Sequence, residues 1–449
     1  MSRQPLTSRE AAVTVQRRVE RGEHADRVLH ALASQHALAP PVAARAMALA
    51  YGSVRLRNRC DAVLAPLLTR PLAALDAPLR AVLRVGAYEL LWAEQCEAAP
   101  TVHALVELAG RLGHEGWRRL TNAVLRAVAR RAEELRVPAA ELDAARDPVG
   151  WLTAWESLPA WLAERWCERF GAERALALGQ AANAQPVLCL RVNPLRATRD
   201  ELQARLAGSG CSCTPGDWSG QALRVESAGP PERLPGWREG WCSVQDEAAM
   251  LIAALAEPTP GARVLDLCAA PGGKATHLAE LLGNQGQVLA CDESAERLAQ
   301  LAPAAKRLGL DCITPLVADA RGLAQTVAPA DVVVLDAPCT GTGTLARRVD
   351  LRWRLGPERL AAATSRQAEL LRTAAALVKP GGVLVYATCS LEPEENQEQL
   401  ERLAHECPTL APDSPAAPPP GWDRERGWAV VWPRAGVSDG FFLARRRRV

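Results

Sequence analysis

Two cysteines lie in short segments of small residues that follow apolar runs. Cys339 stands in DAPCTGTG and Cys389 in VYATCS, each beyond a stretch that is typical of a buried strand. A thiol at a strand end can be reached by a substrate, and it becomes a nucleophile when it loses its proton. Two such thiols in one place indicate covalent catalysis, in which one sulfur attacks and the other assists a later step.

Carbon 5 of cytosine is a target that needs covalent catalysis. It is a poor nucleophile until a thiolate adds to carbon 6, which makes the ring enamine-like and able to take a methyl group. The adduct must then lose its C5 proton and expel the sulfur, and a second thiol can assist there. The carboxyl of Asp336, shortly before Cys339, can bond the N3 and N4 edge of the base. The residues alone do not rank the two thiols.

The segment RVLDLCAAPGGKATHL, residues 263–278, predicts a strand, a tight turn and a helix. Glycines at such a turn let backbone N–H groups approach a ligand, and the helix presents its positive N-terminus there. The spacing is not the dinucleotide fingerprint. It is not a P-loop either, because Cys268 replaces the first Gly and Ala275 follows Lys274. Lys274 and the helix N-terminus would help a nearby thiol to ionise.

Acidic residues fall at or beside the ends of predicted strands, the edge where ligands bind in an open α/β sheet. They are Asp266, Asp292, Asp319 and Asp336. Asp292 lies 20 residues after Gly272, the spacing at which a carboxylate meets ribose hydroxyls, and Asp319 is placed to accept from an adenine amino group. Nothing in the pattern suits nicotinamide or Mg-nucleotide chemistry, so we expect S-adenosylmethionine as the cofactor.

Composition narrows the class of protein and of partner. The first 140 residues carry 20 Arg and 13 acidic residues, a balance of +7, which leaves −5 on the rest of a chain of net charge +2. A basic part beside a near-neutral one suits RNA. Cysteines isolated in apolar segments indicate reduced core residues, and no ligand pair accompanies Cys211 and Cys213, so no metal is expected. The sequence has no membrane-length apolar run and no signal peptide, so we expect a cytoplasmic protein. We also expect it to be a monomer.

The predicted elements indicate a multidomain chain. We expect an all-α bundle over residues 1–137, a helical connector with four tryptophans suited to burial over 138–185, a small α+β module over 186–245, and a doubly wound, Rossmann-like α/β domain over 246–449. Within the last domain, strands are expected at 263–267, 287–292, 313–317, 331–336 and 382–388, and helices at 275–282, 295–308, 364–378 and 393–404. An edge hairpin, 428–432 with 440–444, precedes a basic tail at 445–448.

Several segments resemble one family. DLCAAPGGKATHL, DAPCTGTGTLARRVDLRWR, GGVLVYATCSLEPEEN and the terminal DGFFLARRR are similar to the Sun-type (Fmu) RNA cytosine-5 methyltransferases. LRAVLRVGAYELLW and LTNAVLRAVARR resemble the NusB-like RNA-binding domain. The resemblance covers the whole chain and extends to the bacterial member that modifies small-subunit ribosomal RNA. It therefore implies formation of 5-methylcytosine in 16S ribosomal RNA.

The resemblance also implies roles for single residues. Cys389 would be the nucleophile and Cys339 the cysteine needed for release. Thr340 stands where the family usually has Ser, so the hydroxyl is kept and a methyl group is added. The S-adenosylmethionine site would be formed by Cys268, Ala269, Ala270, Pro271, Gly272, Gly273, Lys274, Asp292, Asp319 and Asp336.

Contacts with RNA are expected from Lys274 in the turn and from Arg191 and Asn193 in the small module. Arg191 and Asn193 share one face of a predicted strand, because alternate residues of a strand lie on the same side. That face either contacts RNA or lies at the edge of a sheet.

Other functions stay open. DNA cytosine-5 methyltransferases use the cysteine of a Pro-Cys loop after the fourth strand, which here would make Cys339 the attacking residue. The second cysteine, in a Thr-Cys-Ser strand end, favours RNA. The same chemistry on transfer RNA is a second possibility. A third is an RNA-binding assembly or antitermination factor with a vestigial methyltransferase fold, against which the intact cysteines and strand-end acids argue.

Overall fold

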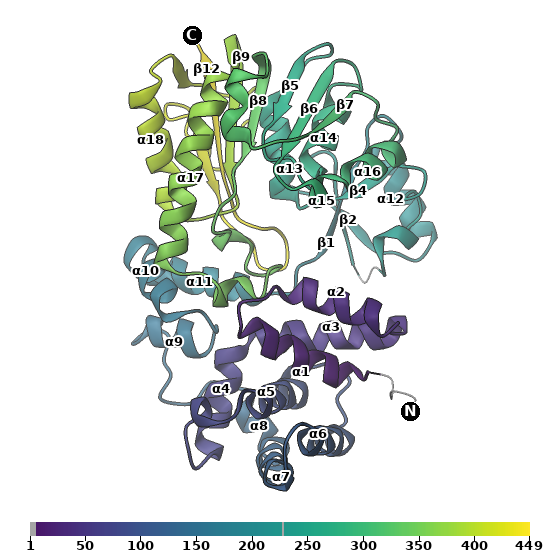
Figure 1. The fold of residues 1–449 in the computed structure, drawn as a ribbon, viewed down its shortest axis with the longest axis vertical. Coiled ribbons are helices and arrows are strands. Elements are labelled where there is room, and N and C mark those ends of the chain that lie inside the picture. Colours follow the sequence, from purple (N-terminus) through teal and green to yellow (C-terminus); the bar gives the residue numbers. More distant parts are fainter. Residues whose placement is uncertain (1–5, 227–228) are drawn as a thin grey trace. The chain divides into compact units, whose positions relative to one another are not determined.

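Residues 6–226 and 229–449 are described by the computed structural model, in which the chain divides into two units (Figure 1). The first unit contains residues up to Ala184 together with Leu345–Leu355. The second contains Gln185–Thr344 and Gly356–Val449. This division into two units is coarser than the four segments predicted from the sequence, so their boundaries stay predictions. Within the described ranges, no helix combines the length and the apolar character that a membrane span needs.

The first unit is all-α, as predicted. A capping box opens its first helix, because the Thr7 side chain accepts from the Glu10 amide and the Glu10 carboxylate accepts from the Thr7 amide. The apolar faces of the helices meet in a core that includes Leu49, Leu83 and Leu105. Its α-helices are α1 (Ser8–Val19), α2 (Ala25–Gln35), α3 (Pro40–Arg55), α4 (Arg57–Leu64), α5 (Ala77–Trp92), α6 (Ala98–Leu112), α7 (Glu115–Arg130), α8 (Ala132–Leu135), α9 (Pro148–Ala154), α10 (Ala160–Phe170) and α11 (Ala172–Asn183).

The tryptophans of the connector serve packing, as their spacing predicts. Trp166 is buried in α10. The Trp155 ring lies edge-on to Trp92 at 6.5 Å, and the guanidinium of Arg59 lies 4.4 Å from the centre of the Trp155 ring. Such ring and cation contacts fix the connector against the helical bundle within this unit.

A segment from the C-terminal half of the sequence completes the first unit. Arg352 is fully buried there, and its guanidinium donates to the carbonyls of Arg55 at 3.1 Å and Ala182 at 2.8 Å and to the Asn183 side chain at 2.9 Å. The neighbouring indole of Trp353 donates to the Val54 carbonyl at 2.8 Å. Burial lowers the pKa of Arg352 to about 9. The sequence gives no sign that residues 345–355 pack with the helices.

The second unit begins with a small antiparallel sheet in the order β2-β3-β1-β4, flanked by the helix α12 (Arg199–Gly208). The predicted small α+β module is therefore confirmed. A second capping box, between Thr198 and Glu201, starts α12. The strands are β1 (Leu188–Val192), β2 (Cys213–Pro215), β3 (Ala222–Val225) and β4 (Cys242–Val244).

The large sheet of the second unit has the order β10-β12-β9-β8-β5-β6-β7, with β11 paired to β12. Its parallel strands confirm the doubly wound prediction. They are β5 (Arg263–Asp266), β6 (Gln287–Asp292), β7 (Ile313–Val317), β8 (Ala330–Asp336) and β9 (Val378–Thr388), joined antiparallel by β10 (Leu410–Pro412), β11 (Trp428–Val431) and β12 (Phe441–Arg448). The α-helices around it are α13 (Glu247–Ala256), α14 (Gly273–Leu281), α15 (Ala295–Leu298), α16 (Leu301–Leu308), α17 (Pro357–Ala376) and α18 (Gln397–Glu406).

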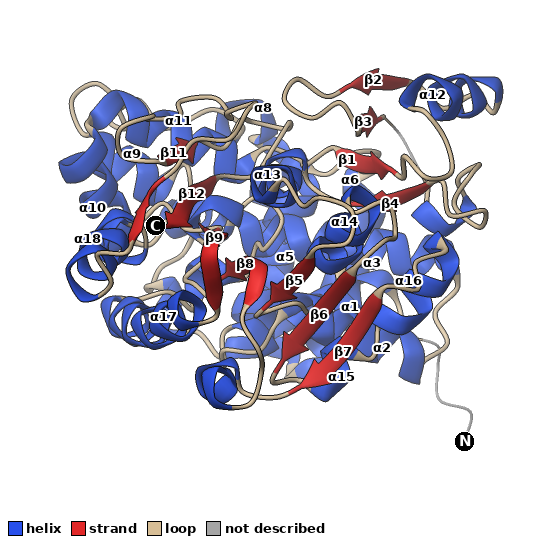
Figure 2. Cartoon of the chain, turned by 90° about the horizontal axis from the view of Figure 1, so that it is seen from above, coloured by secondary structure: helices blue, strands red, loops and turns tan. Residues whose placement is uncertain are grey.

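Helices cover both faces of this sheet (Figure 2). Alternate residues of β5 point to opposite faces, so Val264 joins the core under α13 and α14 while Leu265 joins the core under α17 and α18. The strand order reverses between β5 and β8, because the chain runs outward from β5 through β6 to β7 and then returns to β8. Ligands of doubly wound sheets bind at such a switch point, beyond the carboxyl ends of the strands.

Three predictions for the C-terminal half are wrong in detail. The expected hairpin is present, because β11 pairs antiparallel with β12, but β12 continues through the expected basic tail and lies between β9 and β10. Arg445 is buried because its guanidinium pairs with Asp413 at 2.8 Å and with Glu257 at 2.6 Å. The helix expected at 393–404 begins later, since a 3-10 turn, η7 (Pro393–Glu395), precedes α18. The helix expected at 295–308 is divided into α15 and α16.

Candidate active site

The turn after β5 is shaped for close approach to a ligand. Gly272 has a φ of +117°, and a Cβ atom there would lie 2.6 Å from the Leu301 side chain, so glycine is required. A Cβ atom on Gly273, the first residue of α14, would meet open space. The turn is held against β6 by hydrogen bonds from the Ala269 amide to the Cys291 carbonyl and from the Ala270 amide to Asp292.

Asp266, at the end of β5, is buried, and its carboxyl oxygens have no hydrogen-bond partner among the described residues. Burial raises its pKa to about 7, although the nearby charge of Lys274 opposes the rise. A buried carboxyl without a partner is unusual in a folded protein, because an unpaired polar group is costly there. Its position at the switch point therefore indicates a place for a ligand with hydrogen-bond donors.

The other predicted acids lie at the same edge in different surroundings. Asp292 is nearly buried and accepts from the amides of Ala270 and Ser294, each at 3.0 Å. Asp319 is half-exposed, and its carboxylate faces the Arg321 guanidinium at 2.6 Å. Hydrogen bonds from Arg321 lower the pKa of Asp319 to about 2. Of the remaining predicted turn residues, Cys268 is half-buried, and burial holds the pKa of its thiol well above the usual value.

Lys274 and Asp336 form an ion pair at this edge, with 2.5 Å between Nζ and Oδ2. Burial lowers the pKa of Lys274, but the negative charges of Asp336, Asp266 and Cys389 raise it, and the net shift is upward. The ammonium group is therefore a fixed positive charge next to the ends of β5 and β8.

The two predicted thiols meet. Cys339 follows β8 and Cys389 follows β9, and their sulfur atoms lie 3.3 Å apart. Because β8 and β9 are adjacent parallel strands with Asp336 beside Ala387, the chain leaves both strands at the same level. Both side chains are partly exposed, so a substrate can reach them. The hydrogen bond to Cys389, together with burial, raises the pKa of the Cys339 thiol well above its usual value.

Comparison with known proteins points to one family. Residues 253–447 match the family described as 16S rRNA methyltransferase RsmB/F, residues 6–130 match the NusB family, and residues 158–232 match an RsmF/B-like ferredoxin-like domain. A probable ribosomal RNA small subunit methyltransferase B from Synechocystis is 35% identical over 450 residues, covering 99% of this chain and 100% of the relative. The chain belongs to the RsmB/F family of 16S rRNA methyltransferases.

Further relatives support the same family. The ribosomal RNA small subunit methyltransferase B of Pseudomonas putida is 35% identical over 399 residues, which is 88% of each chain. The crystal structure of PH0851 superimposes with a TM-score of 0.80 at 27% identity and covers both chains fully. NSun6 from Pyrococcus horikoshii, solved with SFG, shares the fold at a TM-score of 0.59 and 23% identity over 66% of this chain and 99% of its own. The resemblance to Sun-type methyltransferases is thus confirmed.

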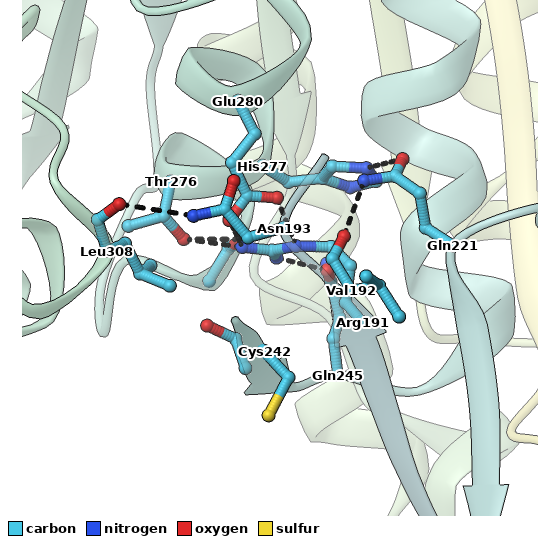
Figure 3. A network of polar contacts seen from close by, with 12 residues as sticks. Arg191, Val192, Asn193, Gln221, Cys242, Gln245, Thr276, His277, Glu280 and Leu308 are labelled. Atoms are coloured by element: carbon cyan, nitrogen blue, oxygen red, sulfur yellow. Dashed lines mark hydrogen bonds and ion pairs between the residues drawn. The ribbon is translucent and has the colours of Figure 1, made fainter. Parts of the chain in front are cut away.

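In this RsmB/F family member, the predicted RNA contacts of Arg191 and Asn193 are wrong, because both side chains are fully buried. Figure 3 shows the network of polar contacts that they form inside the protein. Arg191 forms an ion pair with Glu280 of α14 at 2.7 Å and donates to the Gly273 carbonyl, also at 2.7 Å. Asn193 donates to the carbonyls of Gly240 and Leu308. β1 is an inner strand, paired on both sides, and the Arg191 side chain on this face is bonded to Thr276 and Glu280 of α14 instead of facing solvent.

Two buried residues near the thiols have no predicted site role. Glu395 and Asn396 contact the segments around Cys339 and Cys389. They lie in the segment that carries the family resemblance, yet acidic and amide residues after a strand usually face solvent. Their burial depends on contacts with distant residues, and no local pattern reveals it.

We expect the Arg191→Ala variant to lose about 3–5 kcal/mol of folding free energy, because it leaves the Glu280 carboxylate buried without its partner. The double variant Arg191→Met/Glu280→Leu should recover most of this loss, since it removes both charges and keeps the volume. Urea denaturation of the full chain measures both values. A loss below about 1 kcal/mol for the single variant, or no recovery in the double variant, would contradict the assigned role.

Proposed function

We propose that this protein transfers a methyl group from S-adenosylmethionine to carbon 5 of a cytosine in 16S ribosomal RNA, with Cys389 as the transient nucleophile. The observation that carries the proposal is the 3.3 Å separation of two partly exposed thiols beyond the carboxyl ends of β8 and β9. Membership of the RsmB/F family supports both the methyl transfer and the RNA substrate.

The residues at the switch point fit the cofactor. The partnerless carboxyl of Asp266 suits the amino group of the donor's methionine part, and the open space before Gly273 leaves room at the N-terminus of α14. Asp292 would hold the ribose, Asp319 the adenine amino group, and residues 268–274 the rest of the donor. SFG, found with the related NSun6, is an analogue of S-adenosylmethionine. When bound, the cofactor supplies the methyl group.

The electrostatics favour Cys389 over Cys339 as the attacking residue. The raised pKa of Cys339 keeps its proton in place, so Cys339 can donate a hydrogen bond to the Cys389 sulfur. The fixed ammonium of Lys274 adds a positive charge that stabilises a thiolate at Cys389. This ranking of the thiols was left open by the residue types alone.

The reaction then follows from the positions of these groups. The Cys389 thiolate adds to carbon 6 of cytosine, which breaks the C5–C6 double bond and makes carbon 5 nucleophilic. Asp336 accepts a hydrogen bond from the N4 amino group of the base, and Lys274 stands beside it to contact the RNA. After methyl transfer, a water molecule accepts the C5 proton, the electron pair of that C–H bond restores the C5–C6 double bond, and the C6–S bond breaks with its electron pair on the Cys389 sulfur. Cys339, 3.3 Å away, protonates the departing sulfur.

The Cys389→Ala variant should lose methyl transfer completely and form no protein–RNA bond. The Cys339→Ala variant should instead accumulate a covalent complex with 16S ribosomal RNA, because attack is retained and release is impaired. Denaturing electrophoresis with radiolabelled RNA measures the adduct. The control is Cys312→Ala, which alters a cysteine outside the loops of Cys339 and Cys389. An adduct with Cys389→Ala would assign the attack to the other thiol.

Loss of this gene in its host should remove a 5-methylcytosine from 16S ribosomal RNA and leave transfer RNA unchanged. Bisulfite sequencing of total RNA from the deletion strain and from the parent makes the comparison. Loss of a 5-methylcytosine from transfer RNA instead would mean that the protein performs the same chemistry on transfer RNA. If the 5-methylcytosines of both RNA classes are the same in the two strains and calorimetry shows no binding of S-adenosylmethionine, the methyltransferase assignment fails.

Affinity for S-adenosylmethionine should rise several-fold between about pH 6 and about pH 7.5, where an α-amino group stays largely charged. The reason is that Asp266, with a pKa of about 7, ionises over this range and then attracts the amino group. Isothermal titration calorimetry measures the dependence. Asp266→Asn should bind more weakly and show a flat profile over the same range. An unchanged profile in that variant would place the amino group elsewhere.

A further inference from the structure

The turn that follows Cys389 reaches back to both cysteine loops. The carboxylate of Glu395 is fully buried and accepts from the Thr340 amide at 2.8 Å, from the Thr340 hydroxyl, and from the Gln367 amide group at 2.9 Å. Gln367 in turn donates to the Pro338 carbonyl at 2.9 Å. The residues on both sides of Cys339 are thus fixed, directly or through one amide, to a single carboxylate.

Asn396, the next residue, forms hydrogen bonds with the residues on both sides of the other cysteine, Cys389. Its side-chain oxygen accepts from the Thr388 hydroxyl at 2.6 Å, and its side-chain nitrogen donates to the Ser390 carbonyl at 2.9 Å. These contacts lie on both sides of Cys389. The loop of Cys339 and the loop of Cys389 also contact each other, because the hydroxyls of Thr340 and Ser390 lie 3.1 Å apart.

We propose that Glu395 and Asn396 act together as a positioning clamp for the two thiols, with Glu395 fixing the loop of Cys339 and Asn396 fixing the loop of Cys389. Neither residue is expected to touch the base or the cofactor. This inference rests on the proposed function for its catalytic meaning, but the spacing of the thiols can be tested without RNA.

The clamp matters because nothing covalent holds the two sulfurs together. Each lies on a loop beyond its strand, and hydrogen bonds between the strands end at Ala337, whose amide donates to Ala387. Beyond that point, the Gly343 amide donates to the Cys389 carbonyl and the Leu391 amide donates to the Thr342 hydroxyl. The Ser390 hydroxyl also lies within hydrogen-bond distance of the hydroxyls of Thr340 and Thr342, so the loops are joined by small-residue contacts that Glu395 and Asn396 support from behind. Proton transfer needs the donor within hydrogen-bond reach, so a small shift of either loop would impair release more than attack.

Glu395→Gln is the informative variant. A glutamine has about the same shape but only one acceptor oxygen, so its NH2 group would face a donor from Thr340 or Gln367. Glu398→Gln, the same chemical change at an exposed position of α18, is the matched control. Thr340→Ser keeps the hydroxyl and should behave like the wild type.

The first test measures thiol spacing by disulfide formation with diamide, a diazene oxidant. Two thiols lose two protons and two electrons to form the disulfide, and diamide is reduced to the hydrazine. The thiols of the wild type should cross-link readily, and Glu395→Gln and Asn396→Asp should cross-link roughly tenfold more slowly, the effect of losing one hydrogen bond of a charged group. Peptide mapping of the disulfide between Cys339 and Cys389 gives the rate. Cross-linking of both variants at the wild-type rate would overturn the proposal.

The second test separates positioning from general stability. With intact Cys339, Glu395→Gln should accumulate the protein–RNA adduct, because attack by Cys389 is retained while release is slowed. In a Cys339→Ala background, Asn396→Asp should slow adduct formation itself. Equal loss of attack and release in both variants would mean that the turn is merely structural. If Glu395→Gln does not fold, Gln367→Leu is the second variant, because it removes the hydrogen bonds to Glu395 and Pro338 and leaves those between Glu395 and Thr340. It should give the same adduct to a smaller extent, and absence of the adduct would overturn the proposal.

Failure of the proposed function gives a different pattern. If neither the wild type nor Cys339→Ala ever forms an adduct with RNA, the covalent mechanism is wrong. The diamide rates would still decide whether Glu395 and Asn396 set the distance between the two sulfurs.

Discussion

The contact between two sulfur atoms is the constraint on which the candidate active site depends. Cys339 and Cys389 are 50 residues apart in the sequence, yet their sulfurs lie 3.3 Å from each other. Adjacent parallel strands bring them to one level, and the buried carboxylate and amide of Glu395 and Asn396 hold the loops beyond the strands. A shorter or shifted β9 would separate the thiols even if every residue near them were kept.

Charge at the switch point makes the surroundings of the two thiols different. The ammonium of Lys274 lies between the carboxyl groups of β5 and β8, and its positive charge is retained because Asp336 offsets the cost of burial. The hydrogen bond to Cys389 and burial raise the pKa of the Cys339 thiol, which is the basis for proposing Cys389 as the attacking residue. The turn after β5 is anchored by Arg191, whose contact with the Gly273 carbonyl ties the small sheet to the start of α14.

Much of the fold could be predicted from periodicity. The strands expected at 287–292 and 313–317 coincide with β6 and β7, and the Thr7 capping box starts α1, because these signals are local. The convergence of thiols and acids at one edge was also predictable, since parallel strands present their carboxyl ends together. The family resemblance supplied what periodicity lacks: the RNA substrate and the order of the two cysteines.

What could not be predicted depends on long-range packing. Arg191 and Asn193 share one face of a predicted strand that was expected to contact RNA or to lie at the edge of a sheet, yet tertiary packing gives them buried partners in α14 and beyond. The arginines at the C-terminus look like a solvated tail, but Asp413 and Glu257 neutralise Arg445 inside the sheet. Buried charges of this kind are fixed by partners far away in the sequence, which no window of a few residues contains.

The most direct test of the central claim is to identify the cysteine that carries the base. RNA containing 5-fluorocytosine at the target position blocks the last step, because fluorine cannot leave carbon 5 as a proton does, so the adduct of the unmodified enzyme persists. Mass spectrometry of the digested complex then shows which peptide bears the nucleotide. The account predicts the peptide that contains Cys389, and a nucleotide on the Cys339 peptide, or on neither, would contradict it.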